Sequence, residues 1–313
     1  MRRASVPIPD GATCPRRVTV SARIHGSAPD AVASLAPVSE DPQPRTDDLH
    51  SRTDDRRDEP SSAGNQPSPR RNEPGPRRNE PSLRRNQLGQ PIGPDLGDWT
   101  PPPRPQATTL EGRWTRLERL DLGRHGPDLW RAFSADEDGQ MWTYLPFGPF
   151  ADEAELTATL AAVDGERDLR FFAVVDPTTG EAIGLLSYLR IEPEAGSIEV
   201  GAVMFSPRLQ RTRMATEALF LMADHVFALG YRRFEWKCDA LNEPSRRAAE
   251  RFGFTFEGVF RQATVYKHRS RDTAWFSLLD HEWPDRRPGY LRWLAEENFD
   301  AEGQQIQPLR VRL

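Results

Sequence analysis

The segment Ile198-Glu199-Val200-Gly201-Ala202-Val203-Met204-Phe205 runs into Ser206-Pro207-Arg208-Leu209-Gln210-Arg211-Thr212-Arg213 and then into Met214-Ala215-Thr216-Glu217-Ala218-Leu219. The first part has the apolar character of a strand, the second is a polar turn, and the third opens an amphipathic helix. The first turn of a helix leaves backbone N–H groups without intrahelical partners, and the helix dipole favours anions there. The stretch therefore predicts a strand–turn–helix unit that binds phosphate or pyrophosphate, with an ordinary arginine-bearing turn as the alternative.

The segments on either side extend this unit into a domain. Before it, a strand is expected over 111–120, short helices over 124–134 and 152–163, and antiparallel strands over 171–175, 181–191 and 197–205. After the helix over 214–229 come a strand at 233–238, a helix at 243–252, strand-like segments at 254–260, 264–268 and 273–279, and a last helix over 290–299. The order predicts an α+β fold with one central mixed sheet flanked by helices, and Trp236 and Trp275 are expected in its core.

Proline and aromatic residues divide the 313-residue chain unevenly. Residues 1–106 hold 19 of the 29 prolines but only one of the 28 aromatic residues, Trp99. Such a composition buries too little apolar surface to offset the entropy of ordering the backbone. We expect a disordered Arg/Pro-rich tail over 1–87, with an arginine-rich anion-binding arm as the less favoured reading, and an extended arm over 88–109 anchored by Trp99. The domain then covers 110–282, and a C-terminal helix and tail cover 283–313.

A second motif lies downstream of the phosphate-binding unit. Asn242-Glu243-Pro244-Ser245 opens a short helix that is closed by Gly253-Phe254. Together with Gln210-Arg211-Thr212-Arg213-Met214-Ala215, which is similar to the loop Q/R-x-x-G-x-G/A, this pattern resembles the GNAT superfamily of N-acetyltransferases. The following Thr216-Glu217-Ala218 narrows the resemblance to the RimJ/RimL-type branch, whose known members acetylate protein N-termini. The resemblance implies the GNAT fold and acetyl-CoA as co-substrate.

The resemblance also implies which residues hold acetyl-CoA. The two parallel strands of the family separate so that the pantetheine arm inserts between them, and backbone N–H groups of the turn hold the pyrophosphate. The residues implied in cofactor binding are Val203, Met204, Phe205, Gln210, Arg211, Thr212, Arg213, Met214, Ala215 and Asn242.

Acetyl transfer to an amine also needs a base for the amine and an acid for the leaving thiolate. Glu199 is the expected base, because it shares a strand face with Gly201 and Val203 and an apolar setting raises the pKa of a carboxyl group; a surface glutamate is the alternative. Ser245 is the second expected catalytic residue, either relaying a proton or capping its helix. Expected acceptor-binding residues are Trp142, Tyr144, Phe147 and Tyr266, with plain packing or a strand-surface position as the alternative.

Two departures from the family pattern leave other functions open. Arg213 stands where the family has a glycine, and Ala249 stands where many members have a tyrosine as general acid. Both fit a non-catalytic acyl-CoA-binding or sensing domain. A third possibility is an interaction protein whose arginine-rich tail docks on ribosome or RNA.

Composition limits the remaining choices. The net charge of −5 argues against a general nucleic-acid binder. The histidines show no metal-ligand spacing, and neither a secretory signal nor a membrane span is expected. Cys14 and Cys238 do not suggest a structural disulfide. We expect a cytoplasmic protein, monomer or homodimer, whose partners are acetyl-CoA and an amine: a protein N-terminus or a small molecule.

Overall fold

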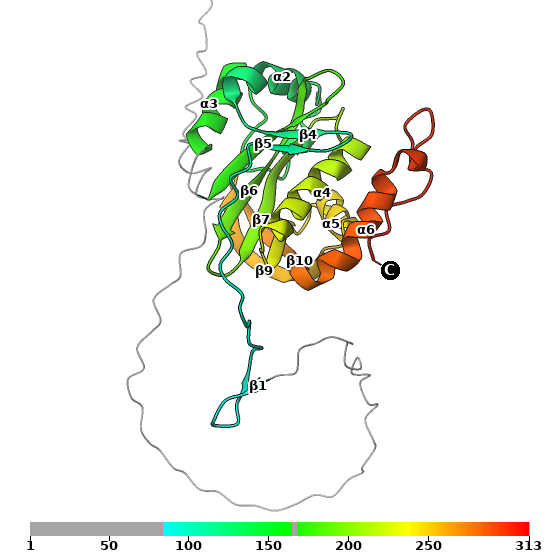
Figure 1. Ribbon diagram of the computed structural model, residues 1–313. Coiled ribbons are helices and arrows are strands. Elements are labelled where there is room, and N and C mark those ends of the chain that lie inside the picture. Colours follow the sequence, from blue (N-terminus) through cyan, green and yellow to red (C-terminus); the bar gives the residue numbers. More distant parts are fainter. Residues whose placement is uncertain (1–83, 165–167, 313) are drawn as a thin grey trace, which may run out of the picture.

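The computed structural model describes residues 84–164 and 168–312 (Figure 1). The predicted tail falls almost wholly on residues 1–83, which lie outside the described residues. The helices are α2 (Leu122–Ser134), α3 (Glu153–Val163), α4 (Arg213–Ala228), α5 (Glu243–Arg251) and α6 (Trp283–Leu294). The strands are β1 (Arg84–Arg85), β2 (Pro91–Ile92), β3 (Thr109–Glu111), β4 (Arg116–Arg119), β5 (Leu169–Val175), β6 (Ala182–Glu192), β7 (Ser197–Phe205), β8 (Arg233–Asp239), β9 (Thr255–Tyr266) and β10 (Arg269–Leu279).

Eight strands form one mixed sheet, which confirms the expected fold class. Their order is β3-β4-β5-β6-β7-β8-β10-β9, while β1 and β2 form a separate small hairpin. Neighbouring strands of the sheet are antiparallel except β7 and β8, which are parallel and joined by the crossover helix α4. At β7 and β8 the sheet therefore changes from antiparallel to parallel pairing.

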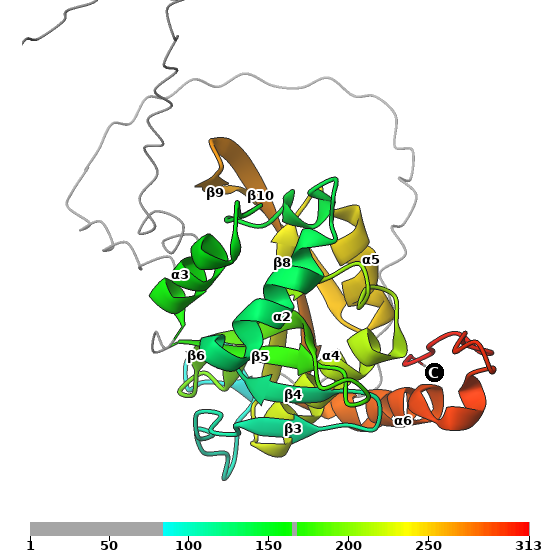
Figure 2. The ribbon, with the colours of Figure 1, turned by 90° about the horizontal axis from the view of Figure 1, so that it is seen from above.

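Helices cover both faces of the sheet, because its strands alternate between two apolar cores. Phe172 and Val174 of β5 belong to the core under α4, α5 and α6, whereas Phe171 and Ala173 belong to the core under α2 and α3. Figure 2 shows α2 and α3 on one side of the sheet and α4 and α6 on the other. Each face is buried by its own helices, and the C-terminal part of β7 passes between the two cores.

The single strand expected over 111–120 is a hairpin, and Glu217 explains the difference. Its buried carboxylate accepts the backbone N–H groups of Arg113, Trp114 and Thr115 at 2.9, 2.6 and 2.7 Å and so organises the turn between β3 and β4. A Cβ at Gly112 would lie 2.5 Å from that carboxylate. The turn therefore depends on a side chain more than 100 residues away, which strand periodicity does not reveal.

The last helix begins and ends earlier than expected: α6 runs from Trp283 to Leu294 rather than over 290–299. Pro284 lies in its first turn, where a missing N–H costs nothing. Pro288 lies inside the helix. At the other end, the Trp114 indole N–H donates to the Leu294 carbonyl at 2.8 Å, which satisfies one of the last free carbonyls.

The segment before β3 contacts the domain through Trp99. The Trp99 indole N–H donates to the Gly230 carbonyl at 3.4 Å, and the Arg232 guanidinium lies 5.4 Å from the ring centroid. The small hairpin of β1 and β2 begins before the expected boundary at residue 87, because Arg84 and Arg85 pair with Ile92 and Pro91.

Candidate active site

A cavity of about 350 Å³ opens where β7 and β8 separate. The two strands pair in parallel only from Ser197 to Val200, opposite Arg233 to Trp236. Beyond that point the residues of both strands line the cavity, with the loop after α2 and the β9–β10 hairpin completing the wall. A separated pair of parallel strands leaves main-chain groups available to an extended ligand placed between them.

A bulge in β7 interrupts the ladder to β6 at the same place. Ser187 lies opposite Gly201, but Leu185 lies opposite Met204, so β7 contains one extra residue. Ala202 adopts the left-handed region with φ 47°, and the Ser187 hydroxyl donates to the Gly201 carbonyl at 2.9 Å. A bulge leaves a residue outside the ladder and redirects the strand. The expected residue Val203 lines the cavity, whereas the Met204 side chain is buried in the core under α2 and α3.

The turn that leads into α4 is built by its own side chains. Thr212 is the N-cap, and its hydroxyl oxygen accepts the Ala215 N–H at 3.2 Å. Gln210 donates to the Phe205 carbonyl at 2.8 Å, and Arg211 has φ 63°. The turn is thus fixed without glycine, and the dipole of a 16-residue helix is directed at it.

The Arg213 side chain is used within the fold. Its guanidinium carbon lies 3.6 Å from the Trp114 ring centroid and 5.2 Å from that of Phe299. Of its neighbours, Met214 packs partly buried against the first core and Ala215 is buried. These side chains therefore contribute to packing around the start of α4.

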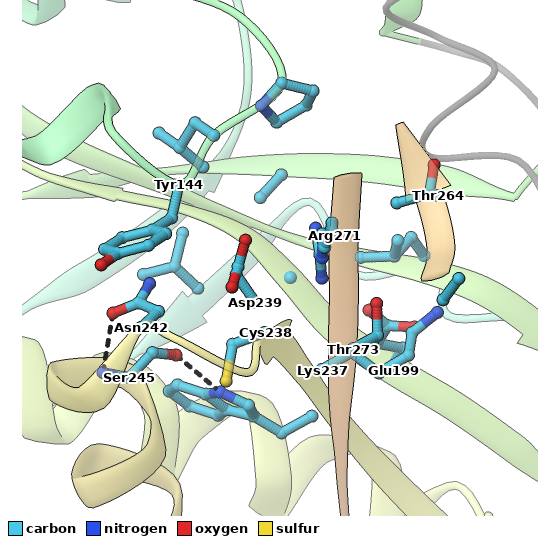
Figure 3. A pocket seen from close by; sticks show the side chains of 18 of the residues that line it. Tyr144, Glu199, Lys237, Cys238, Asp239, Asn242, Ser245, Thr264, Arg271 and Thr273 are labelled. Atoms are coloured by element: carbon cyan, nitrogen blue, oxygen red, sulfur yellow. Dashed lines mark hydrogen bonds and ion pairs between the residues drawn. The ribbon is translucent and has the colours of Figure 1, made fainter. Parts of the chain in front are cut away.

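Asn242 and Ser245 lie on the opposite side of the cavity, at the start of α5 (Figure 3). Asn242, not Ser245, caps the helix: its Oδ1 accepts the Ser245 N–H at 3.1 Å. The Ser245 hydroxyl oxygen accepts the Trp236 indole N–H at 3.0 Å. Burial raises the pKa of the neighbouring Cys238 thiol, and a hydrogen bond from Ser245 opposes that rise. The Ser245 side chain thus lies close to both the Trp236 indole and the Cys238 thiol.

Glu199 is buried rather than on the surface. Its Oε2 lies 2.9 Å from Lys237 Nζ and 3.2 Å from Arg190 Nε, and Arg190 also reaches Glu235 at 3.3 Å. Burial raises the pKa of the Glu199 carboxyl group, while the charges of Lys237 and Arg190 oppose the rise. Glu199 therefore lies in the cavity wall as an ion-paired carboxyl group whose net pKa shift is upward.

Of the expected acceptor-binding residues, Tyr144 and Phe147 line the cavity. The Tyr144 hydroxyl donates to the Leu241 carbonyl at 3.1 Å, which ties the loop after α2 to the start of α5. Trp142 does not line the cavity: it is 3% exposed and packs edge-on against Phe133 and Phe150 in the second core. That placement corrects its expected contact with the acceptor, because aromatic composition alone does not separate a lid from a core.

Tyr266 also lies one layer behind the cavity wall. Its hydroxyl donates to Asp239 Oδ2 at 2.7 Å, and burial raises its pKa to about 12. Asp239 itself lines the cavity and accepts the Leu241 N–H at 2.8 Å. Tyr266 thus orients a wall residue rather than meeting the acceptor itself.

The sequence analysis did not identify several residues that line the cavity wall. They share one sheet face, opposite the core residues Phe234, Trp236 and Cys238 of β8. The missed residues are Arg190, Lys237, Asp239, Arg271 and Trp275. Alternation along β8 was a usable signal for Lys237 and Asp239. Trp275, expected in the core, is half-buried over the cavity, with Lys237 Nζ 4.5 Å from its ring centroid.

Ala249 gives the cavity no proton donor. Its side chain is fully buried in the core under α4, α5 and α6.

Within 84–164 and 168–312, no group of three or more His, Cys, Asp or Glu side chains is arranged to hold a metal ion. No helix in the same ranges is long and apolar enough to cross a membrane.

Comparison with known proteins points to one family. A family model described as an acetyltransferase (GNAT) domain matches residues 117–255. A GCN5-related N-acetyltransferase from Brucella melitensis is 48% identical with a TM-score of 0.67, over 68% of this chain and 97% of that one. A probable GNAT-family acetyltransferase from Chromobacterium violaceum is 44% identical with a TM-score of 0.59, over 62% and 98% of the two chains. The uncharacterised N-acetyltransferase p20 of Bacillus licheniformis is 27% identical over 150 residues, which are 47% of this chain and 84% of that protein.

Proposed function

The chain belongs to the GNAT family of N-acetyltransferases, which transfer an acetyl group from acetyl-CoA to an amine, and we propose how its residues divide that work. The acceptor we propose is a primary amine, on a protein N-terminus or a small molecule, and the cytoplasm is the proposed location. The observation that carries the proposal is the cavity at the separation of β7 and β8, with Glu199 on one wall and Ser245 on the other.

The residues present fit acetyl-CoA. The bulged main chain of Val203–Phe205 would pair with the pantetheine arm, and the N–H groups of Arg211–Ala215 would hold the pyrophosphate. Asn242 would contact the arm through its amide nitrogen, because its oxygen already caps α5. Arg213 would contribute only its backbone, since its side chain stacks on Trp114. Bound there, acetyl-CoA supplies the activated acetyl group.

Glu199 is the proposed base. The raised pKa makes the Glu199 carboxylate a stronger base, so that it can accept a proton from the ammonium group of the acceptor at the working pH. Lys237 and Arg190 keep the carboxylate form present in a buried setting. A main-chain N–H of the bulge polarises the carbonyl, as preorganised donors do at a developing oxyanion.

Ser245 is the proposed acid for the leaving thiolate. Its hydroxyl accepts from Trp236, which leaves the hydroxyl proton free to donate into the cavity. Ser245 also neighbours the Cys238 thiol, where its hydrogen bond opposes the rise that burial causes in the pKa of that thiol. The buried Ala249 makes Ser245 the better candidate.

Tyr144 and Phe147 are proposed to bound the acceptor, with Trp142 and Tyr266 supporting them from behind. The test is a CoA-release assay with the full chain against N-terminal peptides and small amines, with product masses. Release of CoA with a product heavier by one acetyl group is expected. Absence of transfer to every amine would overturn the proposal.

A non-catalytic acyl-CoA-binding domain is the second candidate, and the burial of Ala249 favours it. That function predicts a rise in Tm on adding acetyl-CoA together with no CoA release on the whole amine panel.

A further inference from the structure

We infer that the acceptor amine carries a carboxylate close to it, and that Arg271 binds this carboxylate. The inference rests on the proposed acetylation site and names the class of acceptor for it. A carboxylate-bearing acceptor would be either a small amino acid-like amine or a peptide N-terminus followed by an acidic residue.

The β9–β10 hairpin carries an unbalanced positive charge over the cavity. Between residues 261 and 272 it holds the cations Arg261, Lys267, Arg269 and Arg271 against one carboxylate, Asp272, although the whole chain has a net charge of −5. Among the described residues, none of these four cations lies within 4.0 Å of a carboxylate oxygen. Cations on the adjoining strands are paired: Arg233 with Glu235 and Glu257, and Lys237 with Glu199.

Two of the four cations are used to close the cavity. Lys267 Nζ donates to the Trp142 carbonyl at 2.7 Å, and Arg269 donates to the Thr143 carbonyl at 2.5 Å. Both acceptors are main-chain carbonyls of the loop after α2. These bonds bring the hairpin over the cavity without neutralising either charge, so the hairpin remains attractive to an anion.

A bulge gives Arg271 its position. Thr273 lies opposite Phe260, and Arg271 lies opposite Thr264, so three residues of β9 face Asp272 alone. Gln262 has φ 50°, and its N–H is held by Asp272 Oδ1 at 2.7 Å. Bulges beside functional sites redirect side chains. Arg271 and Thr273 both line the cavity as a result, with Thr264 beside them (Figure 3).

The Arg271 guanidinium lies over an aromatic ring, but its Nε lacks a hydrogen-bond acceptor among the described residues. It lies 5.9 Å from the Tyr266 ring centroid, and its buried Nε has no hydrogen-bond partner among the described residues. Asp239, an acidic residue of the same wall, is held by the Tyr266 hydroxyl and the Leu241 N–H instead. An arginine fork in a cavity matches a carboxylate in both geometry and charge.

The wall also separates the two ends of such an acceptor. Glu199, the proposed base, lies on β7, and Arg271 lies on β10. Lys237 lies between them, since β8 stands between β7 and β10 in the sheet and Lys237 lines the cavity. The amine would thus face Glu199 and its carboxylate the basic hairpin.

The test compares acceptors that differ only in charge. One pair is β-alanine and β-alaninamide; the other is a short peptide with Asp or Asn at its second position. The ratio of kcat/KM for acid over amide is measured in the wild type, in Arg271→Gln and in the matched control Arg261→Gln. Comparing ratios between proteins cancels the intrinsic reactivity of each amine.

We expect Arg271→Gln to lower the acid-over-amide ratio roughly 10- to 100-fold, with Arg261→Gln unchanged and Arg271→Lys intermediate. Loss confined to the β-alanine pair identifies a small acceptor, and loss confined to the peptide pair identifies a protein N-terminus. A ratio unchanged by Arg271→Gln in both pairs would overturn the inference.

A binding measurement separates this inference from the proposed activity. If no amine is acetylated, calorimetric titration of the same acids and amides into the full chain with CoA decides the matter. Binding of an acid that Arg271→Gln weakens upholds the anion site alone, and absence of any preference for the acid in the wild type overturns it.

Discussion

Arg213 lies over Trp114, with its guanidinium carbon 3.6 Å from the ring centroid, and the same indole donates its N–H to the Leu294 carbonyl. The residue that stands where the family pattern has a glycine therefore ties the start of α4 to the β3–β4 hairpin and the end of α6. Its side chain stabilises the fold and leaves the turn open.

The first prediction concerns this stacking. Arg213→Gln should lower the free energy of unfolding by about 1 kcal/mol, because a cation–π contact of this kind contributes roughly 0.5–2 kcal/mol. Urea denaturation measures the change. Arg211→Gln, in an exposed residue of the same turn, is the control and should be near neutral. Equal stability of the two variants would contradict the stacking account.

The second prediction concerns Glu199. Glu199→Gln should lower kcat/KM by roughly 100-fold or more, as expected for loss of a general base. It should also move the acidic limb of the pH–rate profile toward the pKa of the acceptor amine, because the wild-type limb is expected to follow the raised pKa of the Glu199 carboxyl group. Glu235→Gln, which shares the Arg190 partner, is the matched control and should keep the limb. A Glu199→Gln enzyme with the wild-type profile would remove Glu199 as the base.

The third prediction concerns Ser245. Ser245→Ala should lower kcat roughly 100-fold, since thiolate departure would lack its proton donor. The variant should also lose about 1–3 kcal/mol of stability, because the Trp236 indole N–H is left without its partner. Ser245→Thr keeps the hydroxyl and should recover most of both. If Ser245→Ala loses stability but retains kcat, the residue is structural only.

The fourth prediction concerns pH and stability at the outer strand. Arg233 holds the pKa of Glu257 below its usual value through two hydrogen bonds of 2.8 and 2.6 Å. A carboxyl group whose pKa is lowered on folding stabilises the protein above its unfolded pKa, about 4.3, and loses that effect as pH falls through the lowered folded value. Glu257→Gln should thus be less stable than wild type at pH 7, and the difference should vanish near pH 3. A difference that persists at pH 3 would point to lost packing instead.

The sequence was most informative where local periodicity decides structure. The strand, turn and helix around Ser206–Arg213 were predicted closely, and the two motifs pointed to the family. Prediction failed where distant side chains decide: Glu217 folds 111–120 into a hairpin, and Trp114 helps end α6 at Leu294. Trp142 was misassigned because burial in a second core depends on α2 and α3 packing across the sheet.

The candidate site was predicted unevenly for the same reason. Strand alternation suggested Glu199 and the family resemblance suggested Asn242, and both residues line the cavity. Lys237 could have been identified from alternation along β8, but Arg190 and Arg271 reach the cavity from β6 and β10, and the chain order does not show that β10 lies beside β8 with β9 outside it. A residue's partner across a sheet is a property of topology, and periodicity along one strand does not contain it.

The two bonds from Lys267 and Arg269 that close the hairpin over the cavity end on the backbone of the loop, not on its side chains. Every amino acid offers that same carbonyl. The loop can therefore exchange its side chains, including Tyr144 and Phe147 of the proposed acceptor site, while these two hydrogen bonds stay intact. Among homologues of this chain, substitutions that change acceptor preference should accordingly accumulate in that loop. Lys267 and Arg269, which donate the two hydrogen bonds, should be retained.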